Sequence, residues 1–170
     1  CEKRVEQSDK PHWSYILKAF KVRLYIDMGN TEMLDKWLAE SRLSLFHDIV
    51  PAREYEFIVL ARVLIEKHRY DDASILLNFL LIFAQQFKRT HSTVEIINLL
   101  AITAMKNLNE EAALEYFEKA LLIGIEEGYV RSFTDELHPI VTLLEIYIKK
   151  HPGKNRLGTY AKDLLNFTKD

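Results

Sequence analysis

The feature that most constrains the fold is a forty-residue repeat in the middle of the chain. Ala61 and Ala101 are offset by forty residues, and so are Ala73 and Ala113, each pair within a matching helical pattern. In each copy the small alanines allow two antiparallel helices to approach closely. The residues four and seven positions after the second alanine then lock the pair, and they are Leu77 and Leu80 in one copy and Phe117 and Ala120 in the other. A fainter copy precedes them, at Val22, Gly29, Leu34 and Leu38. Helix hairpins at a fixed period of this size are the signature of a helical solenoid.

Helical periodicity runs almost from end to end and predicts about eight helices. We expect Gly29-Asn30 and Gly128 to end helices, Thr31 to cap one, and Pro51 to open one. Five Gly and four Pro, with little Val/Thr-rich alternation, argue against a β-sandwich or barrel. The expected helices span residues 12–28, 31–45, 51–68, 71–88, 90–107, 109–128, 136–150 and 155–167, all approximately.

The predicted architecture is therefore all-α, with antiparallel helix hairpins stacked as a tetratricopeptide-like right-handed superhelix. We expect residues 1–170 to form a single repeat domain, with helix pairs at about 12–46, 52–88, 90–127 and 136–168. The chain begins without Met, and we interpret it as a fragment of a longer protein.

Composition excludes several classes of protein. With 48% hydrophobic and 28% charged residues, the chain has the balance of an ordinary soluble globular protein. A net charge of −2 argues against a generally basic nucleic-acid binder. The longest apolar stretch, Ile75 to Ala84, is about half as long as a membrane span, and the N-terminus does not resemble a signal peptide. The single Cys1 cannot form an internal disulfide, so we expect a cytoplasmic protein.

Catalytic and metal-binding patterns are missing from the sequence. The six histidines are scattered, and none lies three or four residues from another. We therefore expect no enzyme activity, no metal and no cofactor. The basic cluster that begins at Lys149-Lys150 is interpreted as cations at a helix C-terminus, where the helix dipole favours them.

The candidate binding residues are polar side chains on the otherwise apolar inner helices, which face the groove in a tetratricopeptide architecture. A buried charge without a partner is costly, so these side chains must meet solvent, one another or a ligand. Either they bind a polar small molecule or an extended peptide, or they form a solvated concave face with internal ion pairs and no specific site. They are Tyr55, Arg62 and Glu66, then Glu95, Asn98, Met105 and Lys106 one repeat later, with Arg23 and Asp27 on the first helix.

Two segments carry a resemblance to a known family. Leu60 to Leu64, followed by Arg69 to Ala73, and above all the segment Glu127-Gly-Tyr-Val-Arg-Ser-Phe-Thr-Asp-Glu136 with Pro139, are similar to the MalT-type regulators. These are large ATP-dependent transcription activators with a LuxR-type C-terminus. The family usually has glycine after the aspartate-glutamate pair, where this chain has Leu137.

The resemblance implies a division of labour among modules. In such regulators an ATPase module controls assembly, the repeat region receives inducer signals, and a terminal helix-turn-helix binds promoter DNA. This chain has no G-x-x-x-x-G-K-[ST] phosphate loop and no DNA-binding segment after Lys149, so it corresponds to the sensor region. Within the family-like segment, Arg131 and Asp135 either line or relay an inducer pocket, or Arg131 pairs with a carboxylate and caps the turn after Gly128.

Two functions follow as hypotheses. The first is a signal-sensing and coupling domain of a bacterial transcription regulator, which binds an inducer in its concave groove and contacts other domains of the same regulator. The second is a protein-interaction scaffold that binds peptides or partner domains without a small-molecule site. Self-association is compatible with both, and neither involves direct contact with nucleic acid or membrane.

Overall fold

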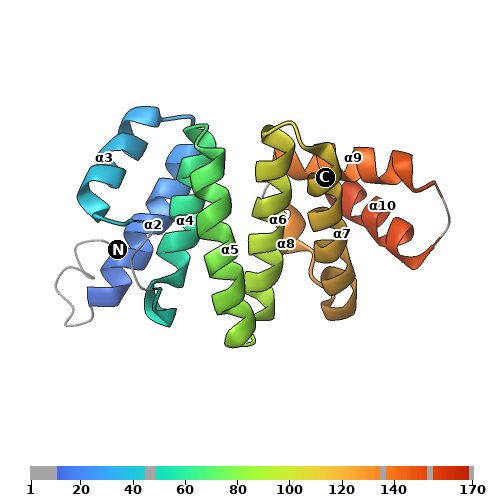
Figure 1. The fold of residues 1–170 in the computed structure, drawn as a ribbon, viewed down its shortest axis with the longest axis horizontal. Coiled ribbons are helices and arrows are strands. Elements are labelled where there is room, and N and C mark those ends of the chain that lie inside the picture. Colours follow the sequence, from blue (N-terminus) through green and yellow to red (C-terminus); the bar gives the residue numbers. More distant parts are fainter. Residues whose placement is uncertain (1–10, 45–48, 135–136, 153–154, 169–170) are drawn as a thin grey trace. The chain divides into compact units, whose positions relative to one another are not determined.

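The computed structural model describes residues 11–44, 49–134, 137–152 and 155–168. Over these residues the chain is helical between short turns and contains no strand, which confirms the all-α prediction (Figure 1). The elements, labelled as in Figure 1, are α2 (Pro11–Asp27), α3 (Thr31–Ser41), η1 (Pro51–Arg53), α4 (Glu54–Glu66), α5 (Tyr70–Gln86), α6 (Thr90–Lys106), α7 (Glu110–Glu127), α8 (Arg131–Thr134), α9 (Leu137–Lys150) and α10 (Arg156–Phe167).

The forty-residue repeat is visible in the way the helices end. Gly29, after α2, has a φ of 64° and donates its N–H to the carbonyl of Ile26, while Asn30 donates to Tyr25. These two bonds form a Schellman turn, which satisfies carbonyls that the helix end leaves unpaired. The same pair of bonds and a positive φ recur at His68 after α4 and at Leu108 after α6.

The ends of the second helices repeat as well. Lys88, after α5, has a φ of 53°, and Gly128, after α7 and forty residues later, has a φ of 70°. The predicted stops at Gly29 and Gly128 are confirmed. The stops at His68, Lys88 and Leu108 were not predicted in this form, because these residues carry a Cβ that disfavours the left-handed conformation.

Asparagine side chains cap the starts of three helices. Asn30 accepts a hydrogen bond from the N–H of Met33, Asn109 from Ala112, and Asn155 from Gly158. The cap of α3 is therefore Asn30, whereas the sequence suggested Thr31, which is the first helical residue instead. An asparagine oxygen placed here satisfies an N–H group that has no partner within the helix.

Three helix boundaries differ from the predicted ones. Helix α3 ends at Ser41 rather than near Leu45, with Arg42 in the left-handed conformation, and residues 45–48 lie outside the described part. Pro51 opens the 3₁₀ turn η1 rather than the α-helix that follows it. The short helix α8 was not expected, and the predicted start of the next helix at Glu136 lies outside the described residues.

Contacts divide the chain into two compact units, Cys1–Phe83 and Ala84–Asp170, which are described separately. In the first unit, α2 packs against both α3 and α4. Residues 56–65 of α4 are all buried. A helix that is apolar on nearly every side requires cover on every side, and α4 obtains it. The ion pair between Lys67 Nζ and Asp35 Oδ1, at 2.6 Å, links α3 to the turn after α4.

In the second unit, α6 and α7 form a tightly packed hairpin, and α9 and α10 pack against each other. Four rings form an aromatic cluster in its core: Phe117, Phe133, Tyr147 and Tyr160. The rings of Phe117 and Phe133 meet edge to face with centroids 6.2 Å apart, and those of Phe133 and Tyr160 do so at 6.0 Å. Aromatic pairs prefer this geometry, and they stabilise a core beyond their buried area.

Not every aromatic residue belongs to a core. The helical spacing of the aromatic residues in the sequence predicts that they mostly belong to the core. Phe57, Phe117 and Phe133 are buried as this predicts, but Phe79 is 54% exposed and Phe87 is 52% exposed, so the prediction is wrong for these two. No helix in the described part of the chain is long and apolar enough to cross a membrane.

Candidate functional site

The first unit holds three of the predicted binding residues, all on α4. Tyr55 is half-buried, Arg62 is only 4% exposed, and Glu66 is exposed. Their spacing places them along one side of the helix, and their exposure changes from one end to the other. The structure thus brings the three into one row without making them equally accessible.

Buried carboxylates accompany Arg62 on the same helix. Glu54 and Glu56 are 2% and 3% exposed, and Glu56 Oε2 accepts a hydrogen bond from Arg53 Nε at 2.6 Å. This bond raises the pKa of Arg53, and the nearby negative charge raises it further, while partial burial lowers it. The guanidinium also lies 5.0 Å from the centre of the Tyr15 ring. Charges this well buried need partners, and Arg53 supplies one for Glu56.

The second unit holds the other predicted residues. Asn98 is fully buried in the middle of α6, Glu95 and Lys106 on the same helix are half-buried, and Arg131 at the start of α8 is exposed. Met105 is half-buried, and Asp135 lies outside the described residues. On the first helix, Arg23 is half-buried and Asp27 exposed.

Asn98 and Ser132 form a buried polar pair across the second unit. Asn98 Nδ2 donates a hydrogen bond to the backbone carbonyl of Ser132 at 2.8 Å. Ser132 is only 7% exposed. Asn98 Oδ1 and Ser132 Oγ are both buried without a hydrogen-bond partner. Unsatisfied buried polar atoms are uncommon in native proteins, because burial without a hydrogen bond costs free energy that a water molecule or a polar ligand group would offset.

The family-like segment around Gly128 links α7 to α8. Gly128 ends α7 with its φ of 70°, and Tyr129 donates its N–H to the carbonyl of Gly124 at 2.9 Å. Tyr160 of α10 donates its hydroxyl hydrogen to the carbonyl of Tyr129. Phe133, fully buried, then inserts into the aromatic cluster. The segment is thus a structural anchor that brings Ser132 to Asn98.

Sequence reasoning identified Asn98 but missed Ser132. The sequence feature that could have identified Ser132 is its place in the family-like segment. Ser132 follows the helix stop at Gly128 and lies between the charged Arg131 and the buried Phe133. Arg131, the neighbouring residue that was predicted, points to the exposed side and is not a buried partner of Asn98.

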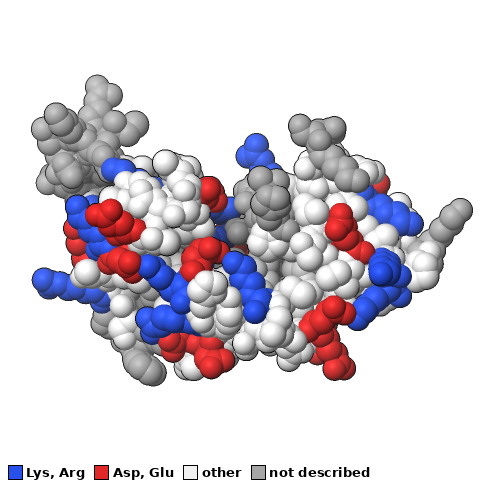
Figure 2. Space-filling view, turned by 90° about the horizontal axis from the view of Figure 1, so that it is seen from above, with Lys and Arg blue, Asp and Glu red and all other residues white. Residues whose placement is uncertain are grey.

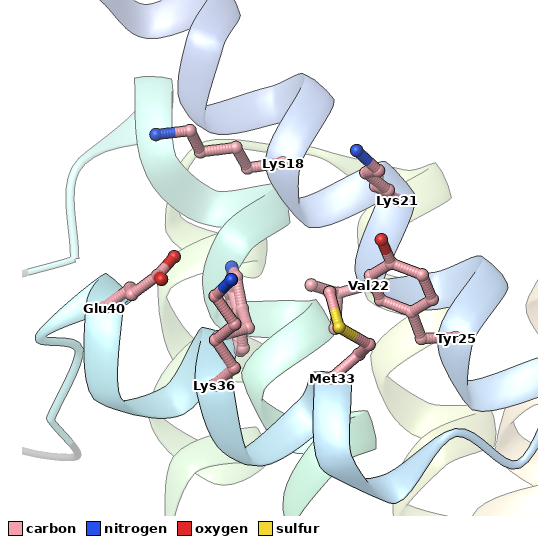
Figure 3. Close-up of a pocket in the computed structure, with 8 residues that line it drawn as sticks. Lys18, Lys21, Val22, Tyr25, Met33, Lys36 and Glu40 are labelled. Atoms are coloured by element: carbon pink, nitrogen blue, oxygen red, sulfur yellow. The ribbon is translucent and has the colours of Figure 1, made fainter.

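A pocket lies between α2 and α3 in the first unit, and the sequence analysis did not predict it (Figure 3). Its volume is about 200 Å³. Lys18, Lys21, Val22 and Tyr25 line it from α2, and Met33, Lys36, Trp37 and Glu40 line it from α3. The sequence feature that could have indicated this pocket is the spacing of two lysines, because Lys18 and Lys21 lie on the same side of α2 as the buried Val22.

An apolar stripe runs along the exposed side of α5. Ile75, Phe79 and Ile82 are 46%, 54% and 64% exposed, and they line a shallow hollow together with Ser74 and Asn78. All five residues belong to the first unit.

Charges of both signs are interspersed over the face of the molecule shown in Figure 2. Among the residues that the structure describes, no group of three or more His, Cys, Asp or Glu is arranged to hold a metal ion.

The hairpins, their recurring Schellman turns and their forty-residue offset define a class: an α-helical repeat domain of the tetratricopeptide type. The model of one family, described as the MalT-like TPR region, matches residues 2–150. The chain therefore belongs to the MalT-like TPR region family. The comparisons with curated proteins and with solved structures return no match.

Proposed function

We propose that this chain is the signal-sensing and coupling repeat domain of a LuxR-type bacterial transcription regulator. The observation that carries the proposal is the family match over residues 2–150, which covers all the described helices up to α9. Helical repeat domains present binding surfaces rather than catalytic groups. The role is non-enzymatic: the domain binds an inducer and passes its occupancy to other domains of the same regulator.

The binding residues we propose in the second unit include the Asn98–Ser132 pair. Two buried oxygens without partners support a polar ligand there, because a ligand that donates hydrogen bonds to them removes their desolvation cost. Glu95, Lys106, Arg131 and Asp135 complete this proposed set. The proposed set in the first unit is Tyr55, Arg62 and Glu66.

Coupling requires that the inducer bind one arrangement of the domain more tightly than another, since a ligand shifts an equilibrium only by its differential affinity. In this proposal the Asn98–Ser132 hydrogen bond supplies that difference. It joins α6 to the segment between α7 and α9, so a ligand at the pair changes how firmly the segment is held.

A thermal-shift screen against neutral sugars, amino acids and short peptides tests the proposal, with hits measured by calorimetry. A ligand that binds only the folded state raises stability by about 2.7 kcal/mol at a hundredfold excess over Kd. We expect Glu95→Gln to weaken binding of the hit at least tenfold, while Glu145→Gln, a matched change on the exposed side of α9, leaves it unchanged. A hit that both variants bind equally well, or a screen without a saturable hit, contradicts the proposed site.

The α5 stripe favours a second candidate function, assembly through protein contacts. We propose that its occupant is the same stripe of a second copy. Residues 75–82 read Ile-Leu-Leu-Asn-Phe-Leu-Leu-Ile, the same in both directions apart from the central pair. An antiparallel pairing about a two-fold axis therefore sets Ile75 against Ile82 of the other copy. The stripe carries no charge, so self-pairing brings no like charges together.

Sedimentation velocity over a range of concentrations tests this second function. We expect a reversible dimer that Phe79→Asp abolishes. Leu122→Asp is the matched control, because Leu122 is 52% exposed on α7, close to the 54% of Phe79. A monomer at about 100 μM, or equal disruption by both variants, contradicts pairing through α5.

A further inference from the structure

The pocket between α2 and α3 is built from two equivalent stripes. On α2 the lining residues are Lys18, Lys21, Val22 and Tyr25, and on α3 they are Met33, Lys36, Trp37 and Glu40. Each stripe follows the spacing i, i+3, i+4, i+7, which is the side of a helix that normally meets its neighbour. In each stripe the third residue, Val22 or Trp37, is buried and apolar. Lysines occupy the first two positions of the α2 stripe and the second position of the α3 stripe, whose first residue is Met33.

The floor of the pocket is firmly held. Val22 is 2% exposed and Trp37 is 8% exposed, so both belong to the core between the helices. Helix α3 is further fixed by the ion pair from Asp35 to Lys67. The pocket therefore exists before any ligand arrives, and binding does not require α3 to be ordered first.

The rim of the pocket is dominated by positive charge. Lys18 and Lys21 extend from α2 on one side, while Lys36 and Glu40 rise from α3 on the other (Figure 3). All four are exposed, and Glu40 is the one carboxylate among the lining residues. Ammonium groups of like charge around a concave, partly apolar surface focus a positive potential into it. An anion in the pocket relieves their mutual repulsion.

We propose that the α2–α3 pocket is a binding site for a small anionic ligand, whose phosphate or carboxylate group is held by Lys18, Lys21 and Lys36. The apolar part of the ligand rests on Trp37 and Met33. This inference goes beyond the proposed function, because none of these residues belongs to the sets on α4, α6 and α8.

The size and chemistry of the pocket narrow the class of ligand. Pockets for drug-sized ligands occupy roughly 300–1,000 Å³, so a volume of about 200 Å³ fits a smaller ligand, about the size of one sugar ring with a single anionic group. Lysine acts as a point charge and accepts either type of anion, unlike the planar fork of arginine. The indole of Trp37 and the thioether of Met33 offer an apolar surface, and Glu40 accepts a hydrogen bond from a ligand hydroxyl.

Three sugars that share one ring and differ in the group at C6 test the proposal by calorimetry at constant ionic strength: glucose 6-phosphate carries a phosphate there, glucuronate a carboxylate, and glucose an uncharged hydroxymethyl group. We expect at least one of the two anions to bind saturably and at least tenfold more tightly than glucose. The stronger of the two identifies the preferred anionic group. Affinity falls as salt is raised, because the lysines are exposed and therefore screened. Equal binding of all three sugars, or binding by none, overturns the proposal.

Three single substitutions locate the site. Lys36→Gln is expected to weaken anion binding at least fivefold, and Glu40→Gln to strengthen it about twofold or more, since it removes the opposing charge. Lys162→Gln makes the same change in net charge as Lys36→Gln on the exposed side of α10 and is expected to have no effect. If Lys162→Gln weakens binding as much as Lys36→Gln does, the attraction is non-specific and the proposed site is wrong.

The folded state and the independence of this site are checked in the same experiments. Because Lys36 and Glu40 are exposed, we expect neither variant to shift the melting temperature by more than the control. Glu95→Gln, which tests the proposed inducer site, is expected to leave anion binding unchanged. Failure of one proposal is therefore distinguishable from failure of the other.

Discussion

Asn98 in the centre of α6 donates a hydrogen bond to the backbone carbonyl of Ser132 in α8, and the bond is buried. The two residues lie 34 positions apart in the chain, so the bond joins a repeat hairpin to the segment that follows it. The pair therefore combines a structural role with the polar character that supports a ligand site.

We expect Asn98→Ala to reduce the free energy of unfolding by about 1–3 kcal/mol, because it removes a buried hydrogen bond to the Ser132 carbonyl. Asn78→Ala is the matched control: Asn78 Nδ2 also donates to a carbonyl, that of Ser74, at 2.8 Å, but in an exposed position. Its loss is expected to cost less than about 0.5 kcal/mol. Denaturant titration of both variants measures the difference, and equal losses would show that burial of the Asn98 bond does not matter.

Leu108→Gly is expected to stabilise the second unit by about 1 kcal/mol. Leu108 has a φ of 60° and is 94% exposed, so its side chain strains the turn and contributes almost no buried area. The reverse change, Gly128→Ala, is expected to destabilise by a similar amount, because a Cβ there meets no atom within 4 Å and only the backbone conformation opposes it. A higher melting temperature for Leu108→Gly and a lower one for Gly128→Ala support this explanation, and a fall in both would refute it.

Gly124→Ala is expected to destabilise the second unit by about 1–3 kcal/mol through overpacking. A Cβ at this position would lie 2.6 Å from Phe133 Cε2 and 2.8 Å from the hydroxyl oxygen of Tyr160. If this clash is the cause, combining Gly124→Ala with Phe133→Leu should cost less than the sum of the two single changes. Strictly additive losses would mean that Phe133 is not what the new methyl group meets.

The second unit should lose stability in alkaline solution between about pH 10 and pH 12. Burial is the main cause that raises the pKa of Tyr147 to about 12, with the nearby Glu118 adding to it, and burial raises the pKa of Tyr160 to about 12. In the unfolded chain both phenols have a pKa near 10.0, so the unfolded state releases its protons first as pH rises. The stability that the two protonated phenols contribute to the folded state is complete below pH 10 and is lost as the pH approaches 12.

Unfolding titrations at intervals from pH 8 to pH 12 measure this effect. The double variant Tyr147→Phe with Tyr160→Phe is expected to have lower stability at neutral pH, because the hydrogen bonds to Glu118 and to the Tyr129 carbonyl are lost. Its stability should then change less between pH 10 and pH 12 than that of the natural chain. An identical alkaline decline in the variant would assign the effect to other groups.

The helices themselves were largely predictable, because their signals are local. Hydrophobic spacing placed every long helix within a few residues, and Gly29 and Gly128 end helices as glycine does when a left-handed residue is required. Boundaries set by other residues were harder to place. His68 and Leu108 end helices at the same points of the repeat without being glycine, since the Schellman hydrogen bonds outweigh the strain of a Cβ in that conformation.

The candidate sites were less predictable, because they depend on residues from different helices. Helical spacing identified Asn98 and Arg62 as polar positions on apolar helices, and the structure shows both to be buried. The same spacing did not show that Glu66 is exposed, nor that the lysines of α2 face Lys36 across a pocket. Which side of a helix is covered depends on its neighbours, and spacing alone does not specify them.

The sequence by itself determined the helical class, the repeat and the family, because forty-residue periodicity and helix stops are properties of short stretches of chain. Only the tertiary structure decided which polar groups are buried together and where a pocket remains. Ser132 meets Asn98 because Gly128 turns the chain and Phe133 anchors it in the aromatic cluster. The α2–α3 pocket is lined by residues of both helices, with lysines of α2 and α3 among them, so it exists only once the two helices pack. Such outcomes follow from packing among several helices at once, and packing is not encoded in any one of them.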